Sequence, residues 1–278
     1  MTDHPPSPAI DPAVPHSARI WNYWLGGKDN YHADREAGAA FEATFPDIVA
    51  CARASRAFLI RAVRYLAGEA GIRQFLDVGT GMPAADATHE VAQAIVPEAR
   101  IVYVDNDPIV LVHAQAMLKS APEGTTDYID ADLREPGKIL HEAARTLDFA
   151  EPVAVMLLGT LGHIDSDREA QLIVRRLMAG VPSGSYLVLS DGTNVIRPVQ
   201  VVEATEDYND TGAPPYRLRS PGQLADLFLE GLEILEPGLV SAPRWRPNVL
   251  AALAPGNTLN PVRQPREVDQ FVAVGRKP

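Results

Sequence analysis

The sequence of 278 residues is short of cysteine, of lysine and of long apolar runs, and each shortage excludes something. Cys51 is the single cysteine, so the chain can form no internal disulfide and no cysteine-based metal site. Only four lysines accompany 21 arginines, and the formal net charge is −11. An acidic chain is poorly suited to binding the phosphates of DNA or RNA. We therefore expect a small molecule or a protein, and not a nucleic acid, as the partner.

No apolar stretch reaches the roughly 18–20 uncharged residues that a membrane span requires. The first fifteen residues lack the basic and then apolar layout of a signal peptide. The seven histidines show no pairing of the kind that binds metals, so no catalytic metal is expected. The sequence therefore predicts a cytoplasmic protein without a membrane segment. Because 46% of the residues are apolar, a sizeable core is also expected.

The chain divides into three segments. Residues 1–15 contain five prolines and little apolar content, which predicts a flexible leader. Residues 16–71 are predicted to be helical, most clearly over 53–70, where apolar residues recur at helical spacing. Over 72–278, short apolar runs alternate with helical stretches, which indicates βαβ units and a parallel sheet covered on both faces. Strands are expected at 74–78, 101–104, 127–129, 153–158, 186–189, 232–235 and 270–274. Helices are expected near 84–96, 108–119, 135–147, 167–179 and 220–230.

The first predicted strand runs into a bend rich in glycine, Asp77-Val78-Gly79-Thr80-Gly81. Glycines at a strand end let bare backbone approach a ligand. A helix that starts near Pro83 would present free N–H groups to an anion there. Asp77 at the strand end could reach an ammonium group. A tight turn without any ligand is the alternative.

Acidic residues stand at the ends of the next two predicted strands. Asp105, with Asn106 beside it, follows the first acid by one βαβ unit, and a carboxylate there can accept hydrogen bonds from both ribose hydroxyls. Asp132 ends the third strand, where it could accept a hydrogen bond from an adenine amino group, and Leu133 offers a backbone N–H and an apolar face. A turn acid and a solvated acidic loop are the alternatives. Because the carboxyl ends of parallel strands share one edge, these groups should converge with the glycine bend.

At these positions the sequence resembles the class I S-adenosylmethionine-dependent methyltransferases. Their first motif, Asp-x-Gly-x-Gly, matches Asp77, Gly79 and Gly81, and the acids of their second and third strands match Asp105 and Asp132. The resemblance implies a Rossmann-like α/β fold with a seven-stranded, mostly parallel sheet and helices on both faces. It also implies S-adenosylmethionine as the cofactor, with the methionyl carboxylate at the glycine bend.

More narrowly, the chain resembles an actinobacterial family of methyltransferases described as a domain of unknown function. That likeness covers nearly the whole chain. It is carried by Ser17-Ala18-Arg19-Ile20, Leu25-Gly26-Gly27-Lys28-Asp29-Asn30, Ala33-Asp34-Arg35 and Arg53-Ala54-Ser55-Arg56-Ala57-Phe58-Leu59. It implies the fold and the cofactor but names no acceptor.

The N-terminal helical segment, 16–71, is expected to form a lid over the cofactor and to shape the acceptor pocket. It contains the polar loop 26–30, whose two glycines indicate flexibility. The candidates to face the ligand are Tyr23, Asn30, Arg53 and Arg56. The alternative is a docked helix pair whose arginines are solvated or paired with acids.

Methyl transfer requires mainly the alignment of two reactants, sometimes with a base. Gly159, Thr160 and His163 follow the fourth predicted strand, where Gly159 is expected to contact the cofactor. His163 is a candidate general base for a hydroxyl or amine acceptor. A histidine at such a turn is more often structural, so this role is the weaker hypothesis.

Three functions are compatible with these motifs to different degrees. The first is methyl transfer to a small molecule, and the second is a non-catalytic protein that binds S-adenosylmethionine or S-adenosylhomocysteine. The third, a nicotinamide-dependent oxidoreductase, is disfavoured because Ala84 stands where its motif requires a third glycine.

Overall fold

The computed structural model describes residues 11–117, 120–247 and 266–278, so most of the predicted leader lies outside the described residues. Within these ranges, eight strands form one sheet in the order β3-β2-β1-β4-β5-β8-β6, and β7 also pairs with β8. The strands are β1 (Gln74–Val78), β2 (Arg100–Asp105), β3 (Thr125–Asp130), β4 (Ala154–Leu158), β5 (Tyr186–Gly192), β6 (Glu233–Ile234), β7 (Val240–Ser241) and β8 (Gln270–Arg276). The first five are parallel, and β8 runs antiparallel to β5.

The predicted α/β class and mostly parallel sheet are confirmed. The sequence predicts seven strands, whereas the described residues form eight, because two short strands share the outermost position. β6 pairs with β8 at Gly275 and Arg276, whereas β7 pairs with it at Phe271 and Val272. Pro237 lies between the two short strands and has no N–H to donate to the sheet, which suits an interrupted edge.

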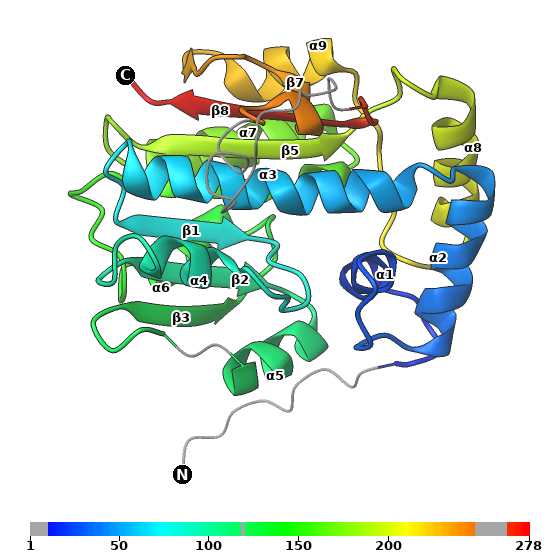
Figure 1. The fold of residues 1–278 in the computed structure, drawn as a ribbon, viewed down its shortest axis with the longest axis horizontal. Helices are drawn as coiled ribbons and strands as arrows, with labels where there is room; N and C mark the ends of the chain where they lie inside the picture. The colour runs from blue at the N-terminus through cyan, green and yellow to red at the C-terminus, as the bar shows by residue number, and fades with distance from the viewer. Residues whose placement is uncertain (1–10, 118–119, 248–265) are drawn as a thin grey trace, which may run out of the picture.

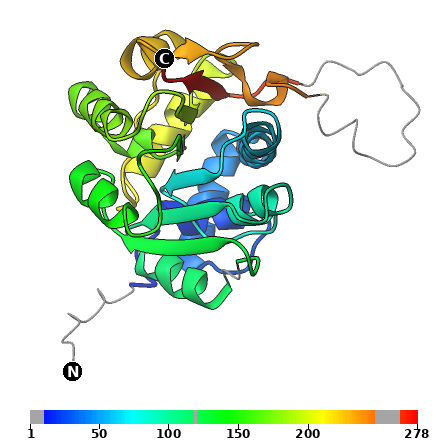
Figure 2. The same cartoon turned by 90° about the vertical axis from the view of Figure 1, so that its left-hand side faces the viewer.

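Helices cover both faces of the sheet, as Figure 2 shows. The α-helices of the described residues are α1 (Ser17–Trp24), α2 (His32–Thr44), α3 (Ile48–Gly68), α4 (Thr88–Gln93), α5 (Pro108–Met117), α6 (Pro136–Ala143), α7 (Asp167–Ala179), α8 (Pro198–Asn209) and α9 (Pro221–Leu224), and all but α1, α2 and α8 pack along the sheet. Alternate residues of each strand serve the two faces. Leu76 of β1 joins the core formed with α6, α7 and α9, whereas Phe75 joins the core formed with α3 and α4.

The helix α3, which the predicted lid segment includes, packs along one face of the sheet. Figure 1 shows it running along the face of the sheet. Its residues Phe58, Ala62 and Leu66 are completely buried in one core with Phe75 and Val188 of the sheet. Only α1 and α2 of the predicted N-terminal segment lie beyond the carboxyl ends of the strands, where α2 packs against α1 and α8.

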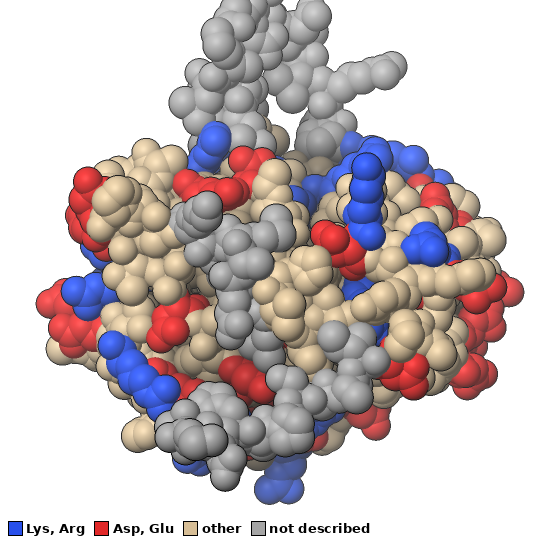
Figure 3. Space-filling model, turned by 90° about the horizontal axis from the view of Figure 1, so that it is seen from below, with Lys and Arg blue, Asp and Glu red and all other residues tan. Residues whose placement is uncertain are grey.

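Acidic and basic side chains are interspersed on the face seen in Figure 3. Over the described residues as a whole, opposite charges often lie close enough to pair, as in the contacts Arg175–Glu230 at 2.8 Å and Arg266–Asp47 at 2.7 Å. No helix within the described ranges combines the length and the apolarity of a membrane span.

A buried arginine attaches the segment after β7 to α3. The Arg61 Nε donates a hydrogen bond to the Trp245 carbonyl at 2.8 Å, and its terminal nitrogen donates one to the Ala242 carbonyl at 2.7 Å. Burial lowers the pKa of Arg61 to about 10. The indole of Trp245 is itself completely buried and meets the Phe58 ring edge-on, with 5.2 Å between ring centroids.

Replacing Arg61 by Met should lower the free energy of unfolding by about 2 kcal/mol, because two buried carbonyls lose their donor. Urea unfolding measures the change. Arg64→Met is the matched control, since Arg64 is on the same helix, is only partly buried and donates no hydrogen bond in the described structure. Equal losses in the two variants would contradict the anchoring role of Arg61.

Candidate functional site

A cavity of about 630 Å³ lies at the carboxyl edge of the parallel strands, beneath α1. We call it the main cavity. Its volume falls within the range of roughly 300–1,000 Å³ that is usual for small-molecule sites. The residues that sequence reasoning placed at the cofactor or the base all lie on its wall: Asp77, Gly79, Thr80, Gly81, Asp105, Asn106, Asp132, Leu133, Gly159 and His163.

The glycine bend is held at the point where β1 and β4 end. Gly79 and Gly81 have φ values of 75° and 68°, a backbone region that residues with a side chain rarely adopt. The Gly79 N–H donates to the Val104 carbonyl at 2.7 Å, which fixes the bend to β2. A β-carbon on Gly79 would overlap the methyl group of Thr160, whereas one on Gly81 would meet open space.

The helix after this bend begins at Thr88, and not near residue 84 as expected. Residues 82–87 are irregular, so a helix N-terminus does not point at the glycine bend. The reason lies in α3, because the Arg56 guanidinium donates to the carbonyls of Ala84 and Ala85 at 3.2 and 2.7 Å. A guanidinium on the cavity wall therefore supplies the positive charge that was expected from the helix.

Asp77 is almost completely buried, and one of its carboxylate oxygens accepts a hydrogen bond from the Thr88 hydroxyl at 2.7 Å. Burial raises the pKa of Asp77 to about 6, against the opposing effects of the Thr88 hydrogen bond and of Arg56. Burial likewise lowers the pKa of Arg56. The Asp77 carboxyl group and the Arg56 guanidinium both line the main cavity, and burial leaves each of them poorly solvated.

Asp105 receives two backbone hydrogen bonds that orient its carboxylate. The Gly81 N–H donates to one oxygen at 2.8 Å, and the Asp107 N–H donates to the other at 2.9 Å. Burial raises the pKa of Asp105. Each oxygen keeps a second lone pair with which it can accept a hydrogen bond from a ligand.

The third acid, Asp132, is more exposed than the other two. One oxygen accepts from the Arg134 N–H at 2.8 Å and the other from the Asn106 amide at 3.2 Å. Leu133 beside it is partly buried against the core. Asn106 thus bridges the ends of β2 and β3 at the cavity wall.

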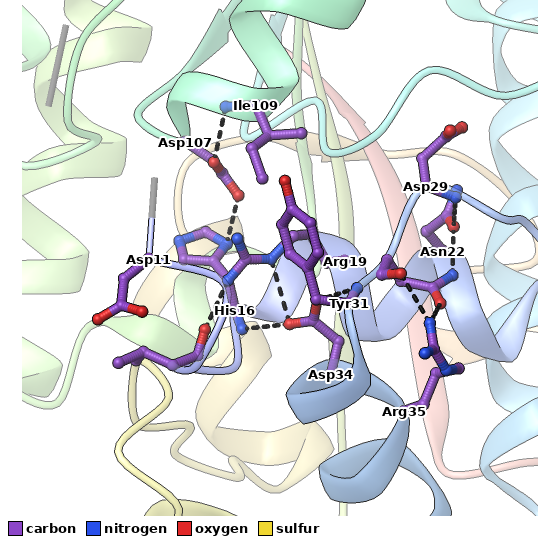
Figure 4. A network of polar contacts seen from close by, with 12 residues as sticks. Asp11, His16, Arg19, Asn22, Asp29, Tyr31, Asp34, Arg35, Asp107 and Ile109 are labelled. Atoms are coloured by element: carbon purple, nitrogen blue, oxygen red, sulfur yellow. Dashed lines mark hydrogen bonds and ion pairs between the residues drawn. The ribbon is translucent and has the colours of Figure 1, made fainter. Parts of the chain in front are cut away.

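The start of α1 is tied to this edge through a polar network, drawn in Figure 4. Asp107 caps α5 by accepting a hydrogen bond from the Ile109 N–H at 2.9 Å, and its second oxygen contacts Nδ1 of His16 at 3.0 Å. The His16 N–H in turn donates to Asp34 at 2.9 Å. Asp34 is completely buried on α2 and also accepts from Arg19 of α1 at 3.1 Å.

The candidate lid residues occupy different positions. Arg56 lines the main cavity, whereas Tyr23, Asn30 and Arg53 are not among its lining residues. Tyr23 packs on Gly38 of α2, and Arg53 is exposed. The Asn30 amide donates to Asn22 at 2.8 Å, so it holds the 26–30 loop and does not face the ligand site.

Several cavity residues carried no recognisable signal in the sequence. His16, Ser17, Trp21 and Asn22 line the main cavity from α1 and the residue before it. They precede the glycine bend by more than fifty residues, and no spacing rule links them to it. Two buried polar atoms on the wall, Arg56 Nε and Thr160 Oγ1, have no hydrogen-bond partner in the described part of the chain.

Comparison with known proteins assigns the chain to a family. A family model described as "S-adenosyl methyltransferase" matches residues 3–278. The chain belongs to this S-adenosyl methyltransferase family. The family assignment gives S-adenosylmethionine as the cofactor and methyl transfer as the class of reaction, in agreement with the motifs of this sequence.

Solved structures agree with this assignment. A DUF574 family protein from Streptomyces avermitilis is 44% identical, with a TM-score of 0.88 over 97% of this chain and 100% of that one. A proposed methyltransferase from Thermobifida fusca is 34% identical, with a TM-score of 0.82 over 99% of each chain. An O-methyltransferase family protein from Burkholderia thailandensis is 14% identical, with a TM-score of 0.50 over 88% of this chain and 59% of that one, a likeness of fold alone. A search of curated proteins finds no match.

In this family member, Gly79→Ala should lower the free energy of unfolding by about 3 kcal/mol, because backbone strain adds to the overlap with Thr160. Gly81→Ala should cost only about 1 kcal/mol, from the positive φ alone. Adding Thr160→Ser removes the obstructing methyl group and should recover part of the loss in the Gly79→Ala protein only. Chemical denaturation of the single and double variants measures this coupling, and equal coupling at both glycines would contradict it.

Proposed function

We propose that the protein transfers the methyl group of S-adenosylmethionine to a small-molecule acceptor that binds next to the main cavity. The observation that supports this most strongly is the convergence of the glycine bend, Asp77, Asp105 and Asp132 on one cavity of suitable volume. S-adenosylmethionine carries a sulfonium, and three acids on the wall suit a ligand with positive charge.

The residues present fit each part of the cofactor. Asp77 would accept a hydrogen bond from the methionyl ammonium, and Arg56, with its unpartnered Nε, would bind the methionyl carboxylate. Asp105, already oriented by two backbone N–H groups, would accept from the ribose hydroxyls. Asp132 and Leu133 would bind the adenine through a carboxylate oxygen and an apolar face.

When bound, the cofactor supplies an already activated methyl group, so the chain has to align and enclose the reactants. The polar network of His16, Asp34 and Asp107 fixes α1 over the carboxyl edge of the sheet. The segment that carries Trp21 and Asn22 therefore covers the cavity and limits the access of water. We propose that α1 and α2, without α3, act as the lid.

The affinity for S-adenosylmethionine should rise with pH through about 6 and level off above it. Asp77 must lose its proton to accept from the ammonium, and burial holds its pKa near 6. Asp77→Asn should bind at least about tenfold more weakly, with no such rise, because a charged hydrogen bond is lost. Isothermal titration calorimetry between about pH 5 and 8 measures both effects.

The cofactor-free protein provides the control for this variant. Folding raises the pKa of Asp77 from 3.8 to about 6, so the folded state favours the protonated acid. The resulting cost in stability is absent below the unfolded pKa, grows as pH rises between the two values and is complete above about 6. Asp77→Asn should therefore stabilise the free protein by about 3 kcal/mol at neutral pH. Unchanged cofactor affinity in a stabilised variant would contradict the role of Asp77.

Methyl transfer itself is measured as release of S-adenosylhomocysteine in the presence of a panel of small acceptors. We expect release with at least one class of acceptor and only slow background without any. Tight cofactor binding without release across the whole panel would instead support the non-catalytic binding protein.

A further inference from the structure

The groups assigned to the cofactor leave one side of the main cavity unused. They follow β3, β2 and β1, and β4 is the next strand in the sheet. The wall beyond β4 is formed by residues of the turn 159–164 and of the segment 214–215. Trp21 of α1 closes this side, because a β-carbon on Gly159 would lie 4.0 Å from its ring. The end of β4 is therefore the side from which an acceptor can approach the cofactor.

The cavity has room for part of a second reactant. Its volume is about 630 Å³. S-adenosylmethionine has about 27 non-hydrogen atoms, which fill roughly 450–500 Å³ at the packing density of a protein interior. The remainder equals several water molecules, each of which occupies about 30 Å³ in the liquid. The reacting end of an acceptor can therefore lie inside the cavity while its body extends beside it.

His163 presents an open ring nitrogen on this wall. Its Nδ1 lies 2.9 Å from the Pro215 carbonyl oxygen, which can only accept, so Nδ1 carries the proton. In the neutral ring, Nε2 then has a bare lone pair. Arg56 Nε and Thr160 Oγ1 are enclosed by protein, whereas Nε2 of His163 is not, so a ligand in the cavity can reach it.

The surroundings of His163 favour the neutral ring at neutral pH. Burial lowers the pKa of His163, and this outweighs the hydrogen bond to the carbonyl described above. The charges of His16 and Arg134 lower the pKa further. Tyr216 meets the imidazole edge-on, with 5.1 Å between ring centroids, and stays protonated because burial and Asp191 raise its pKa. The imidazole is therefore ready to accept a proton.

The segment 214–219, which we call the strap, holds the turn that carries the histidine. Arg219 is completely buried and donates to the carbonyls of Leu161 and Ile164 at 2.8 and 2.6 Å. The Arg217 N–H donates to the Gly162 carbonyl at 2.7 Å. Every residue of the turn from 161 to 164 is thus in contact with the strap, since its Pro215 carbonyl holds the imidazole itself.

Tyr216 ties the strap to the rest of the protein. Its hydroxyl donates to Asp191 and accepts from the Gly192 N–H at 3.0 Å, both at the end of β5. Its backbone N–H donates to the Asn209 side chain at 2.7 Å, at the end of α8. A β-carbon on Gly162 would overlap the Tyr216 ring, so this ring packs directly on the turn. A base held in this way needs no reorganisation when a proton arrives.

A base in this place matters most for an acceptor that is a poor nucleophile until it loses a proton. A hydroxyl group with a pKa of about 10 or more fits this description. A thiol, with a pKa of about 8.5, ionises largely without help, and a free amine already has a lone pair. A cationic acceptor would meet like charge from the sulfonium and from the Arg134 guanidinium, which donates to the His163 carbonyl at 2.9 Å.

We propose that His163 is the general base of the methyl transfer and that the acceptor is an uncharged compound with a hydroxyl group. The hydroxyl donates to Nε2 of His163 at the end of β4. The O–H bond breaks as its proton moves to Nε2, and an oxygen electron pair forms the new bond to the methyl carbon. The electron pair of the broken carbon–sulfur bond stays on sulfur, and Nε2 later releases its proton to water. This assignment rests on the proposed function above.

Chemical modification tests whether Nε2 is open, without requiring turnover. Diethyl pyrocarbonate acylates accessible, neutral imidazoles, and mass spectrometry of peptides locates the product. With the full chain saturated with S-adenosylhomocysteine, we expect His163 to react within about tenfold of the rate of His141, which is exposed on α6. Protection of His163 by S-adenosylhomocysteine would assign it to the cofactor and overturn the proposal. An unreactive His163 in both the free and the loaded protein would also overturn it.

The tautomer is measured from the nitrogen-15 NMR signals of the imidazole, which His163→Asn removes and so assigns. We expect a proton on Nδ1, none on Nε2, and a ring that is neutral above a pH of about 6.5. A bare Nδ1, or a ring that is still charged at neutral pH, would contradict the role of His163 as the base.

Turnover is compared between the wild type and His163→Asn, which keeps a donor for the Pro215 carbonyl but places no acceptor at the Nε2 position. The probes are phenol, benzyl alcohol, benzylamine and benzoate. We expect methyl transfer to the hydroxyl compounds, with kcat lowered at least about 100-fold in His163→Asn and the affinity for S-adenosylmethionine unchanged. His141→Asn is the matched control and should keep the wild-type rate.

Transfer to benzylamine or benzoate in preference to the hydroxyl compounds would overturn the assignment of the acceptor. An unchanged kcat in His163→Asn would overturn the assignment of the base. Failure of the wild type to bind S-adenosylhomocysteine would instead remove the proposed function.

Discussion

The carboxyl ends of β1 and β4 approach each other so closely that a side chain on Gly79 would overlap Thr160. The rest of the site depends on this approach. It fixes a stretch of bare backbone at the floor of the main cavity, from which the Gly81 N–H reaches Asp105 at the end of the neighbouring strand. The sheet thus sets the distances between the polar groups before any ligand arrives, and the helices only have to enclose them.

The parts of the site that lie on strand ends could be predicted from the sequence, because parallel strands with a regular connection bring their carboxyl ends to one edge. The glycine bend and the three acids accordingly line one cavity. The late start of α4 could not be predicted, because it depends on a contact with Arg56. That residue is distant in sequence, and no pattern links it to the start of α4. The helical pattern of the N-terminal segment also could not show which face of α1 packs on α2 and which lines the cavity, so it could not separate the candidate lid residues.

The N-terminal helices combine two properties that hold them to the rest of the protein. Asp34 is completely buried and accepts hydrogen bonds from residues on both sides of the α1–α2 junction, so the two helices move as one body. The same body carries the aromatic rings that pack on α8. The cover that α1 forms over the main cavity is therefore a consequence of this docking arrangement.

Cys51 gives this arrangement a chemical consequence. Thiols are oxidised or alkylated as thiolates, and a buried thiol with a pKa near 12 is almost never in that form at neutral pH. The folded protein should therefore tolerate air and alkylating reagents without a reducing agent. Reaction at this one sulfur would occur only when α1, α2 and α8 separate, which makes the thiol a built-in reporter of how often the N-terminal helices detach.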